Sequence, residues 1–195
     1  FDDIRTLPAS VVTVPILDFE TAATGTKFQY FGSPLDGTFT EIVDNPKGAG
    51  LNTSSKVLKY VKPAVAEVWA GAFSNPNPTT LIDLSGGGKV CVKGHMDHIG
   101  NLSLKLEGST SGKPNWITKV ANTKVNEWEE LCFDASVPSL EPPFEAADGS
   151  YERLVVFFDF GTAGTGSEVV SYFDDVVVKR GGGIVSREVK FKVDM

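Results

Sequence analysis

The sequence has no surplus of basic residues and no long apolar run. Lys and Arg number 18 against 25 Asp and Glu, which gives a formal net charge of −7. A chain with this balance has no basic stripe to neutralise phosphates and gains nothing at an anionic membrane surface, so we expect no nucleic-acid partner. Since no apolar run approaches the roughly 18–20 residues that span a bilayer, we also expect no membrane insertion.

Helical periodicity is missing as well. No stretch of about a dozen residues repeats its apolar positions at helical spacing, and residues 52–62 have room for one short helical turn at most. Short segments rich in β-branched and aromatic residues instead alternate with turn residues, among them 20 Gly and 11 Pro. This pattern predicts an all-β fold, an antiparallel two-sheet β-sandwich of the jelly-roll kind. The segments that we expect to form strands are residues 11–14, 65–69, 89–93, 102–106, 131–133, 154–160 and 173–178.

The expected organisation is one sandwich with an extension at each end. We place the sandwich at residues 16–180 and an N-terminal extension or edge strand at residues 1–15. Residues 181–195 resemble a glycine linker, which begins near Lys179, followed by a strand that either belongs to this domain or starts the next. The chain has no initiator Met and ends within a strand-like pattern, so we expect it to be a piece of a longer protein.

Cysteine is scarce, and the two residues present, Cys91 and Cys132, allow a single pairing. Each lies in a strand-like segment between large apolar neighbours. If those neighbours face the core, alternation turns both sulfur atoms to the opposite face. A disulfide between adjacent strands is then one possibility in an oxidising compartment, and two free thiols are the other.

Catalytic motifs are also absent, and we expect no enzyme. The adjacent carboxylates Glu129-Glu130 and Asp174-Asp175 lie in strand-like segments, where successive side chains point to opposite faces and cannot flank one glycosidic bond. There is no Gly-x-Ser-x-Gly, and the glycine runs match neither a phosphate-binding loop nor a dinucleotide motif. Catalytic groups assembled from scattered loops are the remaining enzymatic alternative.

Three sequence segments carry a family resemblance. They are Ile16-Leu17-Asp18-Phe19-Glu20 at the start of the sandwich, residues 43–57 with Asn52-Thr53-Ser54-Ser55-Lys56-Val57, and Ser171-Tyr172-Phe173-Asp174-Asp175-Val176 at its end. In this order they resemble the galactose-binding-like jelly-roll carbohydrate-binding modules grouped around families 4, 9, 16 and 22. The versions most similar occur in secreted or surface proteins of marine Bacteroidetes.

The resemblance covers about residues 16–178 and implies a non-catalytic module that anchors a secreted or cell-surface protein to a polysaccharide, such as a β-glucan. The implied partners are a polysaccharide or oligosaccharide and the neighbouring domains of a larger protein.

The resemblance also implies a structural calcium ion near the two ends of the sandwich. Its expected carboxylate ligands are Glu20 and Asp174 or Asp175, with Asp18 as an addition and backbone oxygens of residues 47–52 completing the set. Calcium prefers six to eight oxygen ligands, and carboxylates gathered without a cation would repel one another. The alternative is that Asp174 or Asp175 caps a turn or pairs with a lysine.

Saccharides stack on aromatic faces while polar side chains bind their hydroxyl groups. We expect a groove rather than a flat surface. Trp69 lies either on the concave sheet or in the core, Trp116 follows a turn, and Trp128 is expected to pack in the core. The expected stacking residues are Trp69, Trp116, Tyr30 and Phe31, with Phe73 and Tyr151 as further candidates, and the expected polar contacts are His95, Asp97, His98 and Asn115.

The two histidines allow more than one interpretation. His95 and His98 in residues 94–100 could form a polar loop tip, contact a ligand, or bind zinc together with Asp97.

A different class of function stays open: a structural or adhesive surface or filament module. Its basis is the pair of strand-like extensions at residues 1–14 and 184–195, because free strands can complete the sheet of a neighbouring molecule.

Overall fold

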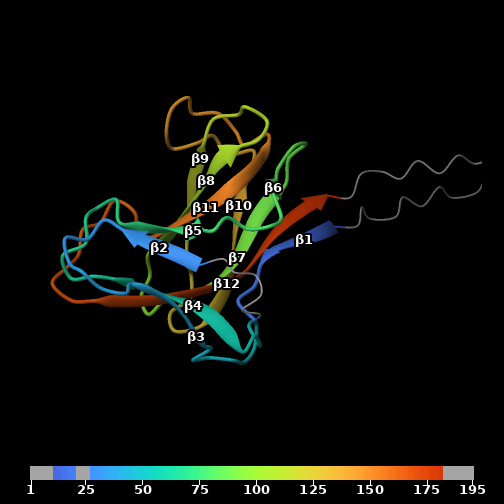
Figure 1. Ribbon diagram of the computed structural model, residues 1–195. Coiled ribbons are helices and arrows are strands. Elements are labelled where there is room, and N and C mark those ends of the chain that lie inside the picture. Colours follow the sequence, from blue (N-terminus) through green and yellow to red (C-terminus); the bar gives the residue numbers. More distant parts are fainter. Residues whose placement is uncertain (1–10, 21–26, 182–195) are drawn as a thin grey trace, which may run out of the picture.

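The computed structural model describes residues 11–20 and 27–181, and it folds them into twelve strands in two antiparallel sheets (Figure 1). The predicted all-β sandwich is confirmed. The described part of the chain forms no helix, and thus none that is long and apolar enough to cross a membrane.

Sheet A has the strand order β10-β7-β12-β4-β3, and β1 pairs with β12 beside this path. Figure 1 shows β1 and the end of β12 side by side, projecting beyond the other strands. The strands of sheet A are β1 (Val11–Leu17), β3 (Thr40–Asp44), β4 (Lys56–Lys62), β7 (Lys89–His95), β10 (Trp128–Asp134) and β12 (Val169–Gly181).

Sheet B has the order β2-β5-β11-β8-β9, and the short β6 pairs with β11. Its central strand is therefore β11, which contacts three other strands of the sheet. The strands of sheet B are β2 (Lys27–Phe31), β5 (Gly71–Asn75), β6 (Ile82–Asp83), β8 (Asn101–Ser109), β9 (Trp116–Ala121) and β11 (Ser150–Phe158).

The core lies between the two sheets and follows the alternation of the strands. In β8, Leu102, Leu104 and Leu106 are fully buried, while Lys105 and Glu107 stand on the other face, as their spacing predicts. Aromatic rings fill the space from both sheets: Phe28 of β2 meets Phe173 of β12 edge to face, with 5.0 Å between ring centroids.

The two cysteines form a disulfide between neighbouring strands. Cys91 of β7 and Cys132 of β10 are directly opposed in the strand register, with 4.1 Å between their Cα atoms and an S–S distance of 2.10 Å. Their neighbours Val90 and Phe133 are fully buried in the core, so alternation does place both sulfurs on the other face of sheet A. The bond attaches the edge strand β10 to the sheet and stabilises the fold by restricting the unfolded chain.

Some segments differ from the prediction. Residues 65–69 form turns and not a strand, because backbone bonds from Ala66 N to Pro63 O and from Ala70 N to Glu67 O fold the segment locally. Residues 52–62 contain strand β4 in place of a helical turn. Strands β2, β3, β5, β6 and β9 are not among the segments expected to form strands, and β2, β3, β5 and β6 are only two to five residues long.

The ends of the sandwich also differ from the predicted boundaries. Lys179, Arg180 and Gly181 belong to β12 and pair with residues 11–13 of β1, so the predicted linker does not begin at Lys179. Residues 11–14 are thus paired within the domain and do not form a free extension. The expectations for residues 1–10 and 182–195 lie outside the described residues.

Candidate functional site

The outer face of sheet B carries a row of aromatic side chains around a groove of about 400 Å³, which we call the aromatic groove. They come from three strands, β2, β5 and β11, and from two loops, one between β4 and β5 and one between β11 and β12. The aromatic residues that line the groove are Phe31, Trp69, Phe73, Phe157 and Phe160.

Alternation along β11 places part of this face outside the core. Val156 and Phe158 point into the core, so Val155 and Phe157 stand on the opposite side of the sheet, in a second apolar cluster. Val155 of β11 is paired with Phe73 of the neighbouring strand β5. The strand is therefore apolar on both faces, and its outer side chains form the floor of the aromatic groove.

Gly71 allows the aromatic rings of the groove to meet. A Cβ atom on Gly71 would lie 2.5 Å from Cδ1 of Phe157 and 2.9 Å from Cζ of Phe31. Without that atom, the rings of Phe31 and Phe157 pack edge to face with 5.8 Å between their centroids. Any side chain at this position would have to displace one of them.

Trp69 stands at one end of the groove with half of its surface exposed (50%). Its indole ring is stacked on Phe31, with 6.0 Å between centroids and 15° between planes. Backbone hydrogen bonds hold its loop: Glu67 N donates to Gly32 O, and Gly161 N donates to Val68 O. The indole is thus a fixed, solvent-facing apolar platform, which is the kind of surface that stacks on sugar rings in proteins.

The polar side of the aromatic groove consists of charges that neutralise one another. Lys105 Nζ lies 2.9 Å from Glu141 Oε2 and 3.5 Å from Glu107 Oε1. Arg153 Nη1 lies 3.7 Å from Glu107 Oε2, and its guanidinium carbon lies 5.2 Å from the centroid of the Phe73 ring. Each cation therefore faces a carboxylate, and the groove offers hydrogen-bond donors and acceptors without an unpaired charge.

Glu141 reaches the groove from the loop between β10 and β11. Leu140 N donates to Ile117 O, which lays this part of the loop along the edge of β9. Burial is the largest single influence on Lys105 and opposes its charge, but the hydrogen bonds and negative charges of Glu141 and Glu107 together outweigh burial and raise the pKa of the lysine. The ammonium group stays charged and holds Glu141 in place.

Two predicted stacking residues, Trp69 and Phe31, lie together in the aromatic groove, and two do not. Trp116 is only 1% exposed, and its indole N–H donates to Val137 O at 2.9 Å. Since Trp116 is paired with the inward-facing Leu106, the strand register turns it into the core in spite of the turn before it. Tyr30 packs against Tyr60 inside the sandwich, and burial raises the pKa of its hydroxyl to about 12. Trp116 is therefore closed to a sugar, and the half-buried Tyr30 does not line the aromatic groove.

Two predicted polar contacts also lie apart from the aromatic groove. His95 is on sheet A, 5% exposed, with its ring edge to face with Trp128 at 5.4 Å. Burial lowers the pKa of His95 and favours the neutral ring. Asn115 is exposed just before β9 and does not line the aromatic groove. Trp128 is buried, as predicted, and donates its indole N–H to Lys47 O.

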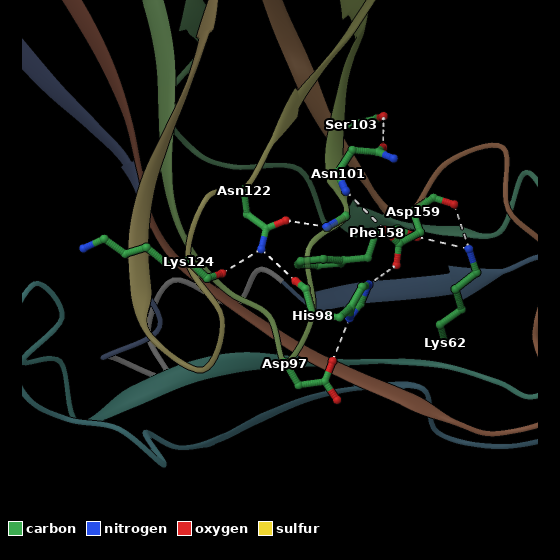
Figure 2. Close-up of polar contacts among 10 residues, drawn as sticks. Lys62, Asp97, His98, Asn101, Ser103, Asn122, Lys124, Phe158 and Asp159 are labelled. Carbon is green, nitrogen blue, oxygen red and sulfur yellow. Dashed lines mark hydrogen bonds and ion pairs between the residues drawn. The ribbon is translucent and has the colours of Figure 1, made fainter.

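His98 and Asp97 lie at one end of the sandwich, in the cluster that Figure 2 shows. His98 Nδ1 is 2.7 Å from Asp97 Oδ1, and its Nε2 is 2.8 Å from Asp159 Oδ2. A ring with a carboxylate at each nitrogen is favoured as the imidazolium cation. Burial opposes the charge, but the hydrogen bonds to Asp97 and Asp159 outweigh it and raise the pKa of His98.

Of the predicted calcium ligands, Asp174 has the most unusual surroundings. It is fully buried (0% exposed), its Oδ2 accepts a bond from Asn52 Nδ2 at 3.0 Å, and its Oδ1 has no hydrogen-bond partner in the described structure. Burial raises the pKa of this carboxyl. A buried carboxylate oxygen without a donor is costly unless a proton or a cation neutralises it.

The other three predicted ligands already have partners. Glu20 accepts bonds from Ser55 Oγ at 2.6 Å and from Lys56 N at 2.8 Å, and these bonds hold the pKa of Glu20 below its usual value. Asp175 pairs with Lys93 Nζ, and Asp18 accepts a bond from the backbone N–H of Glu20.

Among the described residues, no three of these carboxylates gather within 4.8 Å. The group of three potential ligands that does occur there is Cys91, Glu130 and Cys132, whose sulfurs are joined in the disulfide. No described histidine belongs to such a group, so the geometry gives no support to the zinc reading of His95 and His98.

The sequence signals for several groove residues were present but weak. The unbroken apolar run Leu154-Val155-Val156-Phe157-Phe158 indicates a strand that is covered on both faces. The alternation in β8 placed Lys105 and Glu107 outside the core. Nothing in the sequence indicates that Glu141, Arg153 and Phe160 reach the same surface.

No family model matches the chain, and no curated protein matches it in sequence. Solved structures do match in fold. One is a family 11 carbohydrate-binding module from Clostridium thermocellum in complex with a β-1,3-1,4-mixed-linked tetrasaccharide. It is 12% identical, with a TM-score of 0.52 over 85% of this chain and 94% of that chain.

Another match is a variant of the family 29 module CBM29-2 complexed with mannohexaose. It is 9% identical, with a TM-score of 0.52 over 88% of this chain and 94% of that chain. At such low identity the likeness establishes the fold: the chain has the sandwich of the jelly-roll carbohydrate-binding modules. The comparisons give no support to a marine Bacteroidetes source.

The charge on His98 makes stability depend on pH. Because the pKa of His98 is raised in the folded protein, its contribution is complete below about pH 6, where the unfolded residue is also charged. It is lost as pH rises through the folded pKa. We expect the melting temperature of the wild type, relative to His98→Gln, to fall between about pH 6 and pH 8. A wild-type advantage that stays constant over this range would contradict the assignment.

Proposed function

We propose that the chain is a non-catalytic carbohydrate-binding module that holds a neutral polysaccharide or oligosaccharide in the aromatic groove. The observation that carries the proposal is the half-exposed indole of Trp69, stacked on Phe31 above an aromatic floor. A surface with rigid aromatic faces beside paired polar groups is suited to bind pyranose rings. The two structural neighbours described above were solved with a β-1,3-1,4-mixed-linked tetrasaccharide and with mannohexaose, which supports the same ligand class.

The charge arrangement supports a neutral ligand. Lys105 and Arg153 both face carboxylates, so an acidic sugar would have to displace Glu107 or Glu141 to reach a cation. A neutral sugar can accept bonds from the same cations and donate to the same carboxylates without displacing either. β-Glucans and mannans fit this pattern better than alginate or sulfated polymers.

The proposed setting is outside the cytosol, as part of a larger protein. The Cys91–Cys132 disulfide supports this, since such bonds persist in oxidising compartments. In that setting the module would keep an attached enzyme or a cell surface close to a polysaccharide.

Removing the indole should weaken binding. We expect Trp69→Ala to reduce affinity for the bound glucan or mannan about ten-fold or more, because the exposed stacking platform is lost. Affinity gels containing laminarin, barley β-glucan and glucomannan measure the retardation. Val68→Ala is the matched control, since Val68 is the exposed neighbour of Trp69 and does not line the groove. Equal retardation of wild type and Trp69→Ala would refute the placement of the site.

The preference of the groove for a neutral ligand should change when its cations lose their carboxylate partners. We expect Glu107→Gln with Glu141→Gln to introduce retention by alginate at low salt, because Lys105 and Arg153 lose their carboxylate partners. The wild type should pass through alginate gels unretarded. Stronger retention of the wild type by alginate than by any neutral glucan would show that the neutral preference is wrong.

We also propose that Asp174 binds a structural calcium ion, with Glu20 and Asp18 as the other carboxylate candidates. The unpartnered, buried Oδ1 of Asp174 supports this, and the segment of residues 52–56 contacts both Asp174 and Glu20. Calcium would neutralise the buried carboxylate and link the two ends of the sandwich. Asp175 is a weaker candidate, because its carboxylate is already paired with Lys93.

Calcium should raise stability through this carboxylate. After dialysis against a chelator, added calcium at a hundred times its dissociation constant should stabilise the wild type by about 2.7 kcal/mol. Thermal melts with calcium and with chelator measure the difference. Asp174→Asn should melt at the same temperature in both, whereas Asp36→Asn, an exposed loop residue, should respond as the wild type does. Identical melts of the wild type in calcium and in chelator would overturn the site.

A further inference from the structure

A second cavity of about 460 Å³, the end pocket, opens at the end of the sandwich near His98. Its lining joins the last residue of β4, the first residue of β8 and the loop between β11 and β12. Polar residues in its lining include Lys62, His98, Asn101, Asp159, Thr162 and Thr165.

Lys62 places a buried ammonium group at the wall of the end pocket. The residue is 3% exposed, and its Nζ donates to Phe158 O at 3.2 Å and to Asp159 O at 2.9 Å, as Figure 2 shows. An ammonium group has three N–H donors, and the described structure provides these two acceptors. One donor of a fixed, buried cation is therefore left for a further acceptor.

Other polar groups of the end pocket are held rigidly. Asp159 binds His98 through Oδ2 and the backbone N–H of Asn101 through Oδ1. Asn122 accepts a bond from Gly100 N and donates to the backbone oxygen of His98, which fixes the loop that carries the imidazole. The backbone of Asp159 has a φ of 55°, in the left-handed region, and these contacts hold it there.

The end pocket and the aromatic groove lie on two sides of one wall. Backbone bonds from Gly161 N to Val68 O and from Gly164 N to Ala66 O join the β4–β5 loop to the β11–β12 loop. Phe160 lines the aromatic groove, whereas its neighbour Asp159 lines the end pocket. The two cavities are thus separate, although the same two loops build them.

We propose that the end pocket is a second ligand site, which takes one hydroxyl-rich ring such as the terminal residue of a glycan through hydrogen bonds. The inference deepens the proposed function and rests on it for the class of ligand. Lys62 offers a donor, Asp159 an acceptor and Asn101 and Thr162 both, while His98 is occupied by its two carboxylates and holds Asp159 in place. Among the described residues, no Phe, Tyr or Trp lines this cavity. The pocket lies within the range of about 300–1,000 Å³ that small ligands occupy.

The composition of the end pocket also selects against a charged ligand. The imidazolium of His98 is matched by the carboxylates of Asp159 and Asp97, while Lys62 Nζ donates to the backbone oxygen of Asp159. A neutral polyol can bond to these groups in their present arrangement. An anion would compete with the carboxylate of Asp159 for His98.

The test maps binding residue by residue on the complete chain. Backbone amide shifts are recorded by nuclear magnetic resonance during titration with cellotetraose and with mannotetraose, for the wild type and four variants, Asn101→Ala and the three that follow. Trp69→Ala removes the stacking platform of the groove, Thr165→Trp fills the end pocket, and Glu168→Trp places the same bulk on an exposed neighbour that does not line it.

We expect two groups of shifts in the wild type, one around Trp69 and Phe73 and one around residues 98–101 and 159–165. Trp69→Ala should keep the second group, and Thr165→Trp should weaken it at least ten-fold while keeping the first. Asn101→Ala should weaken it in the same direction without added bulk. Glu168→Trp should behave as the wild type.

Shifts at the groove alone in the wild type, weakened by Trp69→Ala and unchanged by the other variants, would overturn the second site and leave the proposed function intact. Shifts at the end pocket alone would support the second site and refute the groove as the binding surface. An end-pocket response that Thr165→Trp and Asn101→Ala leave unchanged would also overturn the inference.

Discussion

The structure depends on the burial of β11 from both sides. Its inner side chains, Val156 and Phe158, close the core between the sheets, and its outer side chains, Val155 and Phe157, form an apolar floor. Because successive side chains of a strand point to opposite faces, one register against β5 and β8 sets both surfaces at once. A shift of one residue would exchange core and groove, so the same hydrophobic burial that stabilises the fold also positions the candidate sugar platform.

The loops at one end of the sandwich separate the aromatic groove above this apolar floor from the end pocket. The β4–β5 loop and the β11–β12 loop are joined by backbone hydrogen bonds, and each contributes to both sides of the wall that they form. Apolar rings gather on the side of the aromatic groove, where Trp69 stacks on Phe31. Paired polar groups gather on the other side, where His98 bridges Asp97 and Asp159. One cavity therefore offers aromatic faces for stacking, and the other offers hydrogen-bonding groups.

The opposite sheet contributes stability. The disulfide attaches β10 to β7, and β1 lies along the end of β12, so the two ends of the described domain are held together. Segment 52–56 links Glu20 near the start of the domain to Asp174 near its end. The unpartnered oxygen of Asp174 marks the place where this arrangement is electrostatically incomplete, and where a cation would contribute most.

The sequence by itself determined the fold class, the outward direction of Lys105 and Glu107, and the shared face of the two cysteines, because alternation with a period of two is a local property of a strand. It also indicated Trp69 and Phe31 as candidates for stacking on a sugar. Only the tertiary structure decided that Trp116 is buried and Tyr30 packs against the core, that His95 and His98 lie outside the aromatic groove, and that Glu141, Arg153 and Phe160 share that groove. Those outcomes depend on the pairing of strands and loops that are distant in the chain, and no local pattern of residues encodes which distant segments meet.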